Sequence, residues 1–235
     1  HLMEFREALR DALDVQAMAA EIRHSRALMF GKTLAGIIKL EFGDLDGAGA
    51  DLGESASIAA SMSSNSSLSQ SLRSLALVRH RQGRSDEARA CAEQALSVSR
   101  TAGMTFIGPA VLATCAAVSD DDDERRQFLE EAERILDKGC VAHNQIWFAQ
   151  VAIDDAVSKG EWQSVRRYAD RLEEYTRNEP LAWATFLVRR ARALEQTRQG
   201  QDNEAARGEL RALGDQAMRA GLSTSHLSSL VCLHQ

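Results

Sequence analysis

The chain has 235 residues, a formal net charge of -6 at pH 7 and a pI of about 5.6. This acidic balance lacks the basic surplus typical of proteins that bind DNA or RNA directly, so we expect no direct nucleic-acid partner. Two prolines, 5% aromatic residues and the absence of any apolar run near the ~20 residues that cross a bilayer favour a helical, cytoplasmic protein with no membrane partner.

The first residues, His1-Leu2-Met3, differ from a natural start, because a natural chain begins with Met. We interpret residues 1–3 as the remnant of an expression tag. A helical pattern begins directly at Glu4, with no leading loop. We therefore expect residues 4–235 to form a single helical-repeat domain that is a fragment of a longer protein.

A short motif led by glycine recurs along the chain. It occurs as Gly43-Asp44-Leu45-Asp46-Gly47-Ala48, Gly83-Arg84-Ser85-Asp86-Glu87-Ala88, Gly160-Glu161-Trp162-Gln163-Ser164-Val165 and Gly200-Gln201-Asp202-Asn203-Glu204-Ala205. The first two glycines are 40 residues apart, as are the last two, and the middle interval of 77 spans two repeats. Glycine ends one helix in the left-handed conformation, a following Asp or Ser caps the next, and the small residue five positions on allows close packing. The motif therefore predicts helical hairpins.

The predicted elements are an initial helix, five helix pairs and a final half-repeat. In chain order they cover 4–24; 25–42 and 45–61; 67–82 and 85–101; 105–118 and 123–138; 144–159 and 162–177; 181–199 and 203–220; and the half-repeat from Ser223. The Ser-rich stretch 61–71 is also compatible with a loop. The predicted fold class is all-α, a stack of about five hairpins with half-repeats at both ends.

Two resemblances follow from these motifs. The run 82–88, continued by Ala92 and 93–96, resembles the centre of a tetratricopeptide repeat, which implies a right-handed superhelical α-solenoid that binds protein partners. In the first hairpin the matching residues are Leu34, Gly36, Gly43, Leu45 and Ala48. The repeats run to about 40 residues instead of the usual ~34.

The phrases at 95–103 and 217–221 resemble helical repeats in MalT-like or LuxR-type transcriptional activators and class III nucleotidyl cyclases. This second resemblance implies a bacterial parent protein that regulates transcription or signalling. Such a parent can itself be an enzyme, either a nucleotidyl cyclase or an ATPase regulator.

In the tetratricopeptide family the first helix of each hairpin lines the concave side. Alignment of the hairpin glycine with the family's fifteenth position places the following candidate partner-binding residues on that side: Arg73, His80, Arg81, Trp147, Gln150, Arg190 and Arg198. Arginine pairs well with carboxylates and tryptophan often anchors partners, so we predict a groove for a peptide or partner domain. The alternative is that the arginines are solvated or pair with a glutamate one turn away, and that the tryptophan only packs.

The sequence offers no arrangement typical of catalysis. The acidic run 120–124 is better explained as a helix cap than as a metal site, because negative charge is favoured at a helix start. Cys140 with His143, and Cys232 with His234, are isolated pairs, whereas a structural zinc site needs four ligands. The four cysteines have no framework spacing and are expected to be reduced. We expect no catalytic, cofactor or metal residues in this part of the protein.

Two other functions stay open. The chain could sense a small-molecule effector, as the resemblance to MalT-like activators would allow. It could also be a structural unit that forms a homodimer through the terminal helices at 4–24 and 223–235. In that case the apolar side chains of the last segment would need a partner: Leu227, Leu230, Val231 and Leu233.

Overall fold

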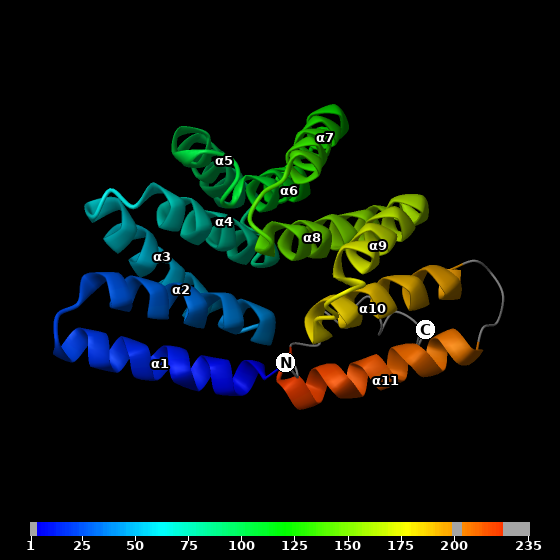
Figure 1. The fold of residues 1–235 in the computed structure, drawn as a ribbon, viewed down its shortest axis with the longest axis horizontal. Helices are drawn as coiled ribbons and strands as arrows, with labels where there is room; N and C mark the ends of the chain where they lie inside the picture. Colours follow the sequence, from blue (N-terminus) through cyan, green and yellow to red (C-terminus); the bar gives the residue numbers. More distant parts are fainter. Residues whose placement is uncertain (1–3, 199–203, 223–235) are drawn as a thin grey trace. The chain divides into compact units, whose positions relative to one another are not determined.

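The computed structural model describes residues 4–198 and 204–222, and in these residues it contains eleven α-helices and no strand (Figure 1). The helices are α1 (Phe5–Glu21), α2 (Ser25–Phe42), α3 (Leu45–Ser61), α4 (Asn65–Arg81), α5 (Ser85–Ala102), α6 (Gly108–Val118), α7 (Asp122–Lys138), α8 (His143–Lys159), α9 (Trp162–Thr176), α10 (Ala182–Arg198) and α11 (Glu204–Ala220). The prediction of an all-α chain built from consecutive hairpins is confirmed. The predicted half-repeat from Ser223, and with it Cys232 and His234, lies outside the described residues.

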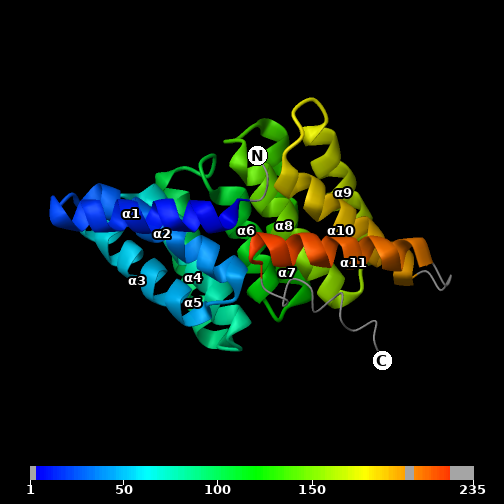
Figure 2. The same cartoon turned by 90° about the horizontal axis from the view of Figure 1, so that it is seen from below.

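The described chain divides into two compact units. The N-terminal unit comprises residues 6–144, and the C-terminal unit comprises 145–198 and 204–222 together with Glu4 and Phe5. In the N-terminal unit each helix from α2 to α7 packs on the next, and the first helix α4 also contacts the first helices α2 and α6. Figures 1 and 2 show α1 lying alongside α2. This order is that of a stack of hairpins.

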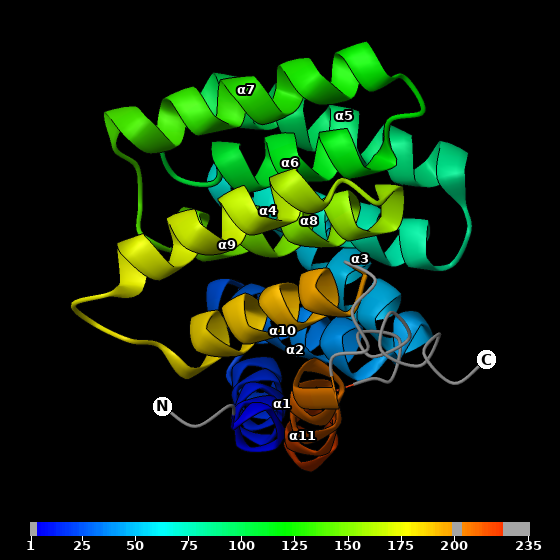
Figure 3. The ribbon, with the colours of Figure 1, turned by 90° about the vertical axis from the view of Figure 1, so that its right-hand side faces the viewer.

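In the C-terminal unit, α10 lies between α9 and α11 in both Figure 1 and Figure 3. The rings of Phe148 on α8 and Tyr168 on α9 meet edge to face, with centroids 5.5 Å apart. Small or apolar side chains on the second helices are fully buried where the motif predicts them, at Val165 here and at Ala48 and Ala88 in the N-terminal unit. In the last hairpin the prediction is wrong by one residue, because Ala205 is exposed and Ala206 is buried instead.

The hairpin turns show why the glycine motif works, and where it does not. Gly43 has φ +80°, and its N–H donates to the carbonyl of Leu40, while the Asp44 carboxylate accepts the N–H of Gly47 at 2.9 Å. Both halves of the predicted turn are therefore present. In the next hairpin Ser85 is already the first residue of α5, one position too late to cap it, and no side chain caps that helix.

Two helix starts differ from the predicted ones by more than one residue. The Ser-rich stretch is helical from Asn65, after a three-residue turn that includes Ser63 at φ +53°. In the third hairpin α6 begins at Gly108 and not at 105, with Pro109 in its first turn, where the missing N–H of proline does not interrupt the helix. The acidic run acts as a cap, as predicted, since Asp121 accepts the N–H groups of Asp123 and Glu124, each at 2.8 Å.

Cys115, a buried residue of α6, provides a test of this packing. Burial raises the pKa of its thiol to about 12, and Sγ lies 3.5 Å from the carbonyl oxygen of Ala92. Because the thiolate is the reactive species, we expect iodoacetamide at pH 8 to alkylate Cys115 about 100-fold more slowly in the folded protein than in guanidinium chloride. Mass spectrometry of the Cys115 peptide measures both rates, and equal rates would contradict this packing.

Candidate functional site

Arg73 is the most buried of the charged residues predicted in the second hairpin. It lies in the middle of α4, and the carboxylate of Glu41 on α2 and the guanidinium of Arg81 act on it electrostatically. Burial, with a smaller contribution from the positive charge of Arg81 and against the opposing effect of Glu41, lowers the pKa of Arg73 to about 10. Arg73 therefore remains a cation at neutral pH, and it is held inside the first-helix layer.

Arg81 and His80 lie at the end of the same helix and are more accessible. Arg81 is half-buried, and its Nη1 donates to the carbonyl oxygen of Leu40 at 2.9 Å, in the last turn of α2. The last carbonyls of a helix carry partial negative charge, so this position favours a cation. His80 is exposed. The structure thus brings Arg73 and Arg81 together and leaves His80 open to solvent.

His143, the first residue of α8, lies near Arg73. The carbonyl oxygen of Phe106 can only accept, so Nε2 of His143 donates to it over 2.6 Å, and Nδ2 of Asn144 donates to the same oxygen at 2.8 Å. Burial lowers the pKa of His143, the bond to Phe106 opposes this, and the positive charge of Arg73 adds to the lowering. His143, which the sequence suggested only as an isolated pair with Cys140, instead holds the turn before α6.

In the C-terminal unit the predicted residues are tied into a different set of contacts. Arg190 on α10 is buried and forms an ion pair with Asp154 on α8. Asp154 follows Trp147 and Gln150 at helical spacings of seven and four residues, so the three share one face of α8. Gln150 is buried and Trp147 is half-buried. The bonded partner of Arg190 is therefore a residue of the neighbouring hairpin and not a glutamate one turn away.

The seven predicted residues do not form one open surface. Three of them, Arg73, Gln150 and Arg190, are buried and cannot reach a partner without a rearrangement. Arg198 is exposed, and its guanidinium lies 5.9 Å from the centroid of the Trp162 ring, a distance typical of a cation–π contact. His80, Arg81, Trp147 and Arg198 are the candidates with accessible surface.

Glu41 is the member of the cluster that the sequence reading missed. A signal for it exists, because Glu41 stands two residues before Gly43, as Arg81 stands two residues before Gly83. The 40-residue period therefore puts opposite charges at the same register position of neighbouring hairpins. Neighbouring repeats contact each other in a repeat stack, so opposite charges on adjacent first helices can come into range of each other.

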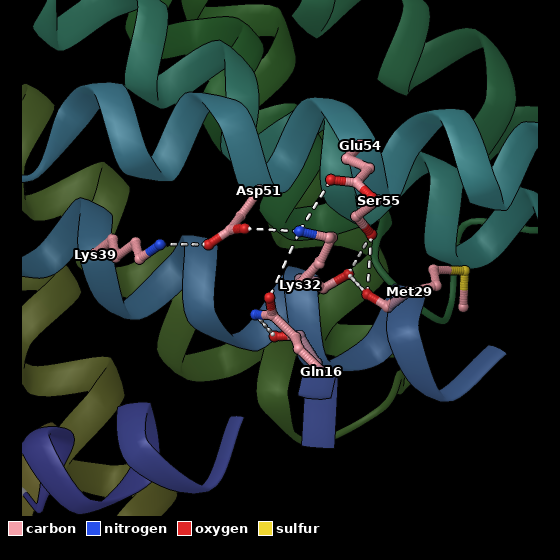
Figure 4. A network of polar contacts seen from close by, with 9 residues as sticks. Gln16, Met29, Lys32, Lys39, Asp51, Glu54 and Ser55 are labelled. Atoms are coloured by element: carbon pink, nitrogen blue, oxygen red, sulfur yellow. Dashed lines mark hydrogen bonds and ion pairs between the residues drawn. The ribbon is translucent and has the colours of Figure 1, made fainter. Parts of the chain in front are cut away.

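A second polar cluster, also missed by the sequence reading, joins α1, α2 and α3 (Figure 4). The buried carboxylate of Asp51 accepts Nζ of Lys32 at 3.2 Å and Nζ of Lys39 at 2.6 Å. Lys32 also reaches Glu54 at 2.9 Å and Oε1 of Gln16 at 3.5 Å. Burial alone would lower the pKa of Lys32, but the carboxylates of Glu54 and Asp51 outweigh it, so the pKa is raised.

Hydroxyl groups continue this network into the interior of the N-terminal unit. Oγ1 of Thr33 lies 2.6 Å from Oγ of Ser55, which lies 3.0 Å from Oγ of Ser71. Oγ1 of Thr33 and Oγ of Ser55 also lie within hydrogen-bonding distance of the carbonyl oxygen of Met29, at 3.0 and 3.1 Å. The chain of hydroxyls links α2, α3 and α4, so this polar layer fixes how the first hairpin meets the second.

Asp51→Asn tests the contribution of the lysine pairs. The amide keeps the shape of the carboxylate but removes the charge shared by Lys32 and Lys39, so we expect the free energy of unfolding to fall by about 1–3 kcal/mol. Urea unfolding followed by circular dichroism measures the loss. Asp14→Asn, at an exposed position of α1, is the matched control and should change stability by less than about 0.5 kcal/mol. Equal effects of the two substitutions would show that the pairs contribute nothing.

Within the described part of the chain no three His, Cys, Asp or Glu side chains are grouped so that they could hold a metal ion. None of the helices described there is both long and apolar enough to cross a membrane. No family model and no curated protein matches the sequence. The fold and the clusters above define a protein of stacked helical hairpins.

Proposed function

We propose that the chain is a non-catalytic protein-interaction module of a bacterial signalling or transcriptional regulator. In this proposal its first helices bind an acidic peptide or an acidic segment of a partner domain. The mechanism is a preformed surface, because helices that already pack on one another need little further ordering when a partner binds. Support comes from the direct contacts of α4 with α2 and with α6.

The observation that carries the proposal is the pair of arginines in the second half of α4. Arg73 and Arg81 supply two positive charges near the carboxylate of Glu41, and the exposed His80, next to Arg81 in the sequence, adds a hydrogen-bonding group. Arg73 is buried, so its charge acts through a medium that screens it less than water does. A ligand carboxylate would contact the more accessible Arg81 and His80, while Arg73 would strengthen the local positive potential.

The regulatory role rests on the resemblance of the repeats at 95–103 and 217–221 to those of MalT-like activators and class III cyclases. In a parent protein of that kind, capture of a partner by the hairpin stack would recruit or position a separate effector domain.

A peptide-binding experiment tests the proposal. Selection from a displayed library of 12-residue peptides should enrich sequences rich in Asp and Glu. Labelled copies of these peptides should bind with dissociation constants of about 10–100 µM, and the dissociation constants should rise as salt is added. Arg81→Glu should weaken binding at least about tenfold. Arg134→Glu, at an exposed position of the second helix α7, is the matched control and should bind normally.

The proposal fails if the library enriches no acidic peptides, or if Arg81→Glu and Arg134→Glu change binding equally. Because Arg81 bonds to α2, its variants are compared by thermal unfolding, and His80→Glu, at an exposed position, provides a second probe of the same surface. Binding that His80→Glu and a folded Arg81→Glu both leave intact would place the ligand elsewhere.

A further inference from the structure

The first helix of the chain has the register of a second helix of a hairpin. Residues of α1 match those of α3 at an interval of 40, so that Ala12 corresponds to Leu52 and Ala19 to Ala59. All four side chains are buried. α1 lies against α2, where Nε2 of Gln16 donates to the carbonyl oxygen of Gly31 at 3.1 Å, as α3 lies against α4. The two helices differ on another side. In α3 this side is covered by α2, the first helix of the same hairpin.

That side of α1 is open. Ser55 on α3 is 0% exposed where it meets α2, whereas Val15, its counterpart 40 residues earlier, is 42% exposed. On the adjoining side of α2, Leu34 is 53% exposed, while its counterpart Ser74, nine residues before the next hairpin glycine, is 1% exposed. The positions that a preceding first helix covers in the other hairpins are therefore uncovered here.

The open surface exposes large apolar side chains to water. Met18 and Ile22 on α1 are 65% and 70% exposed and follow Val15 at helical spacings of three and seven residues. Helical-wheel positions place them on the flank of α1 away from Gln16, the residue that reaches Lys32. We call the set of Asp11, Val15, Met18, Ile22 and Leu34 the open α1 edge.

Charge indicates what kind of helix the open α1 edge would take. Asp51 on α3 is neutralised by two lysines, Lys32 and Lys39, of the helix that covers it. Asp11 occupies the same register position 40 residues earlier, is exposed, and forms no ion pair within the described residues. A helix that covered α1 as α2 covers α3 would bring a cation to Asp11, as Figure 4 shows for Asp51.

We propose that the open α1 edge binds a basic amphipathic helix of a partner protein, antiparallel to α1. The apolar face of this helix packs on Val15, Met18, Ile22 and Leu34, and a lysine or arginine pairs with Asp11. The recognised chemistry is opposite in sign to that of the Arg73–Arg81 cluster, so this surface goes beyond the function proposed above and is tested separately from it. Helix-in-groove recognition with spaced apolar anchors follows the same physics as the packing between the hairpins.

The probe is a labelled synthetic peptide with the sequence of α2, Ser25–Phe42, because α2 packs on the surface of α3 that corresponds to the open α1 edge. We expect it to bind the whole chain with a dissociation constant of about 10–100 µM in fluorescence polarisation. Asp11→Lys should weaken binding at least about tenfold, and a peptide with both lysines replaced by glutamate should bind Asp11→Lys better than it binds the unaltered chain. Ala20→Lys, at an exposed position half a helical turn away from Asp11 on the opposite side of α1, should leave binding unchanged.

The double substitution Met18→Ser with Ile22→Ser removes the apolar anchors without touching a buried residue, so the chain should fold while peptide binding falls at least about tenfold. Three outcomes would overturn the proposal: no binding at about 200 µM peptide, binding that Asp11→Lys and Ala20→Lys reduce equally, or a chain that sediments as a dimer and becomes a monomer in the Met18→Ser, Ile22→Ser variant. The last result would assign the edge to a second copy of the chain.

Discussion

Arg73→Ala should lower the free energy of unfolding of the N-terminal unit by about 3–5 kcal/mol, the range found when one member of a buried charge pair is removed. The side chain of Arg73 is buried in α4, and the nearby Glu41 is buried at the end of α2. Without the guanidinium, the negative charge of Glu41 stays in a poorly solvated site and a space opens in the first-helix layer. Urea unfolding of the whole chain, followed by circular dichroism, measures the loss.

A double-mutant cycle separates charge from packing at this position. If the unpaired charge of Glu41 causes most of the stability loss in Arg73→Ala, the double substitution Arg73→Ala with Glu41→Gln should lose less stability than the sum of the single substitutions, by about 1–3 kcal/mol. Arg73→Met, which restores most of the volume, should recover part of the loss in the Glu41→Gln background. Arg134→Ala, an exposed position on α7, is the control for loss of an arginine and should cost less than about 0.5 kcal/mol. Additive losses would show that Arg73 and Glu41 act independently.

Leu52→Ala should destabilise the N-terminal unit by about 2–5 kcal/mol. Leu52 is fully buried in a core cluster with Leu40, Ala48 and Val78, which come from α2, α3 and α4. Its loss leaves a cavity where three helices meet, so the first hairpin and the start of the second should be weakened together. A shift in the midpoint of urea unfolding with an unchanged slope would be the expected signature.

Gly36 makes a sharper form of this test possible. A Cβ added at Gly36 would lie 2.6 Å from Cγ of Leu52, so Gly36→Ala alone should destabilise by about 1–3 kcal/mol, less the ~1 kcal/mol by which alanine favours a helix over glycine. In the Leu52→Ala background the added methyl group enters space that the leucine has left. The double variant should therefore be more stable than the sum of the two single losses predicts. A sum that holds within about 0.5 kcal/mol would contradict this packing.

The helix boundaries could be predicted because the signals for them are local. Gly43 with Asp44 and the acidic run with Asp121 at its start each encode a turn or a cap in a few neighbouring residues. The wrong start of α6 has the same origin, since the helical pattern extends back to 105 but Pro109 favours a helix start close to itself. Local chemistry thus decided both the successes and this error.

The candidate site was less predictable, because it depends on contacts between helices. The register predicted Arg190 on the partner-binding side of its hairpin, whereas the packed helices bury it and pair it with Asp154 on α8. Glu41 and His143 were missed for the same reason: each acts on Arg73 across a helix boundary, at separations of 32 and 70 residues. Burial of a charged side chain follows from the rotation of its helix, which a list of spacings does not contain.

The sparse packing of α1 has a consequence for the order in which the stack opens. Only Ala12 and Ala19 of α1 are buried, whereas α2 buries eight of its residues. In a protein in which each helix contacts mainly its neighbours, the end with the least buried surface opens at the lowest free energy. The backbone amides of α1 should therefore exchange with deuterated water much faster than those of α3, and a helix bound beside Val15 and Ile22 should slow that exchange.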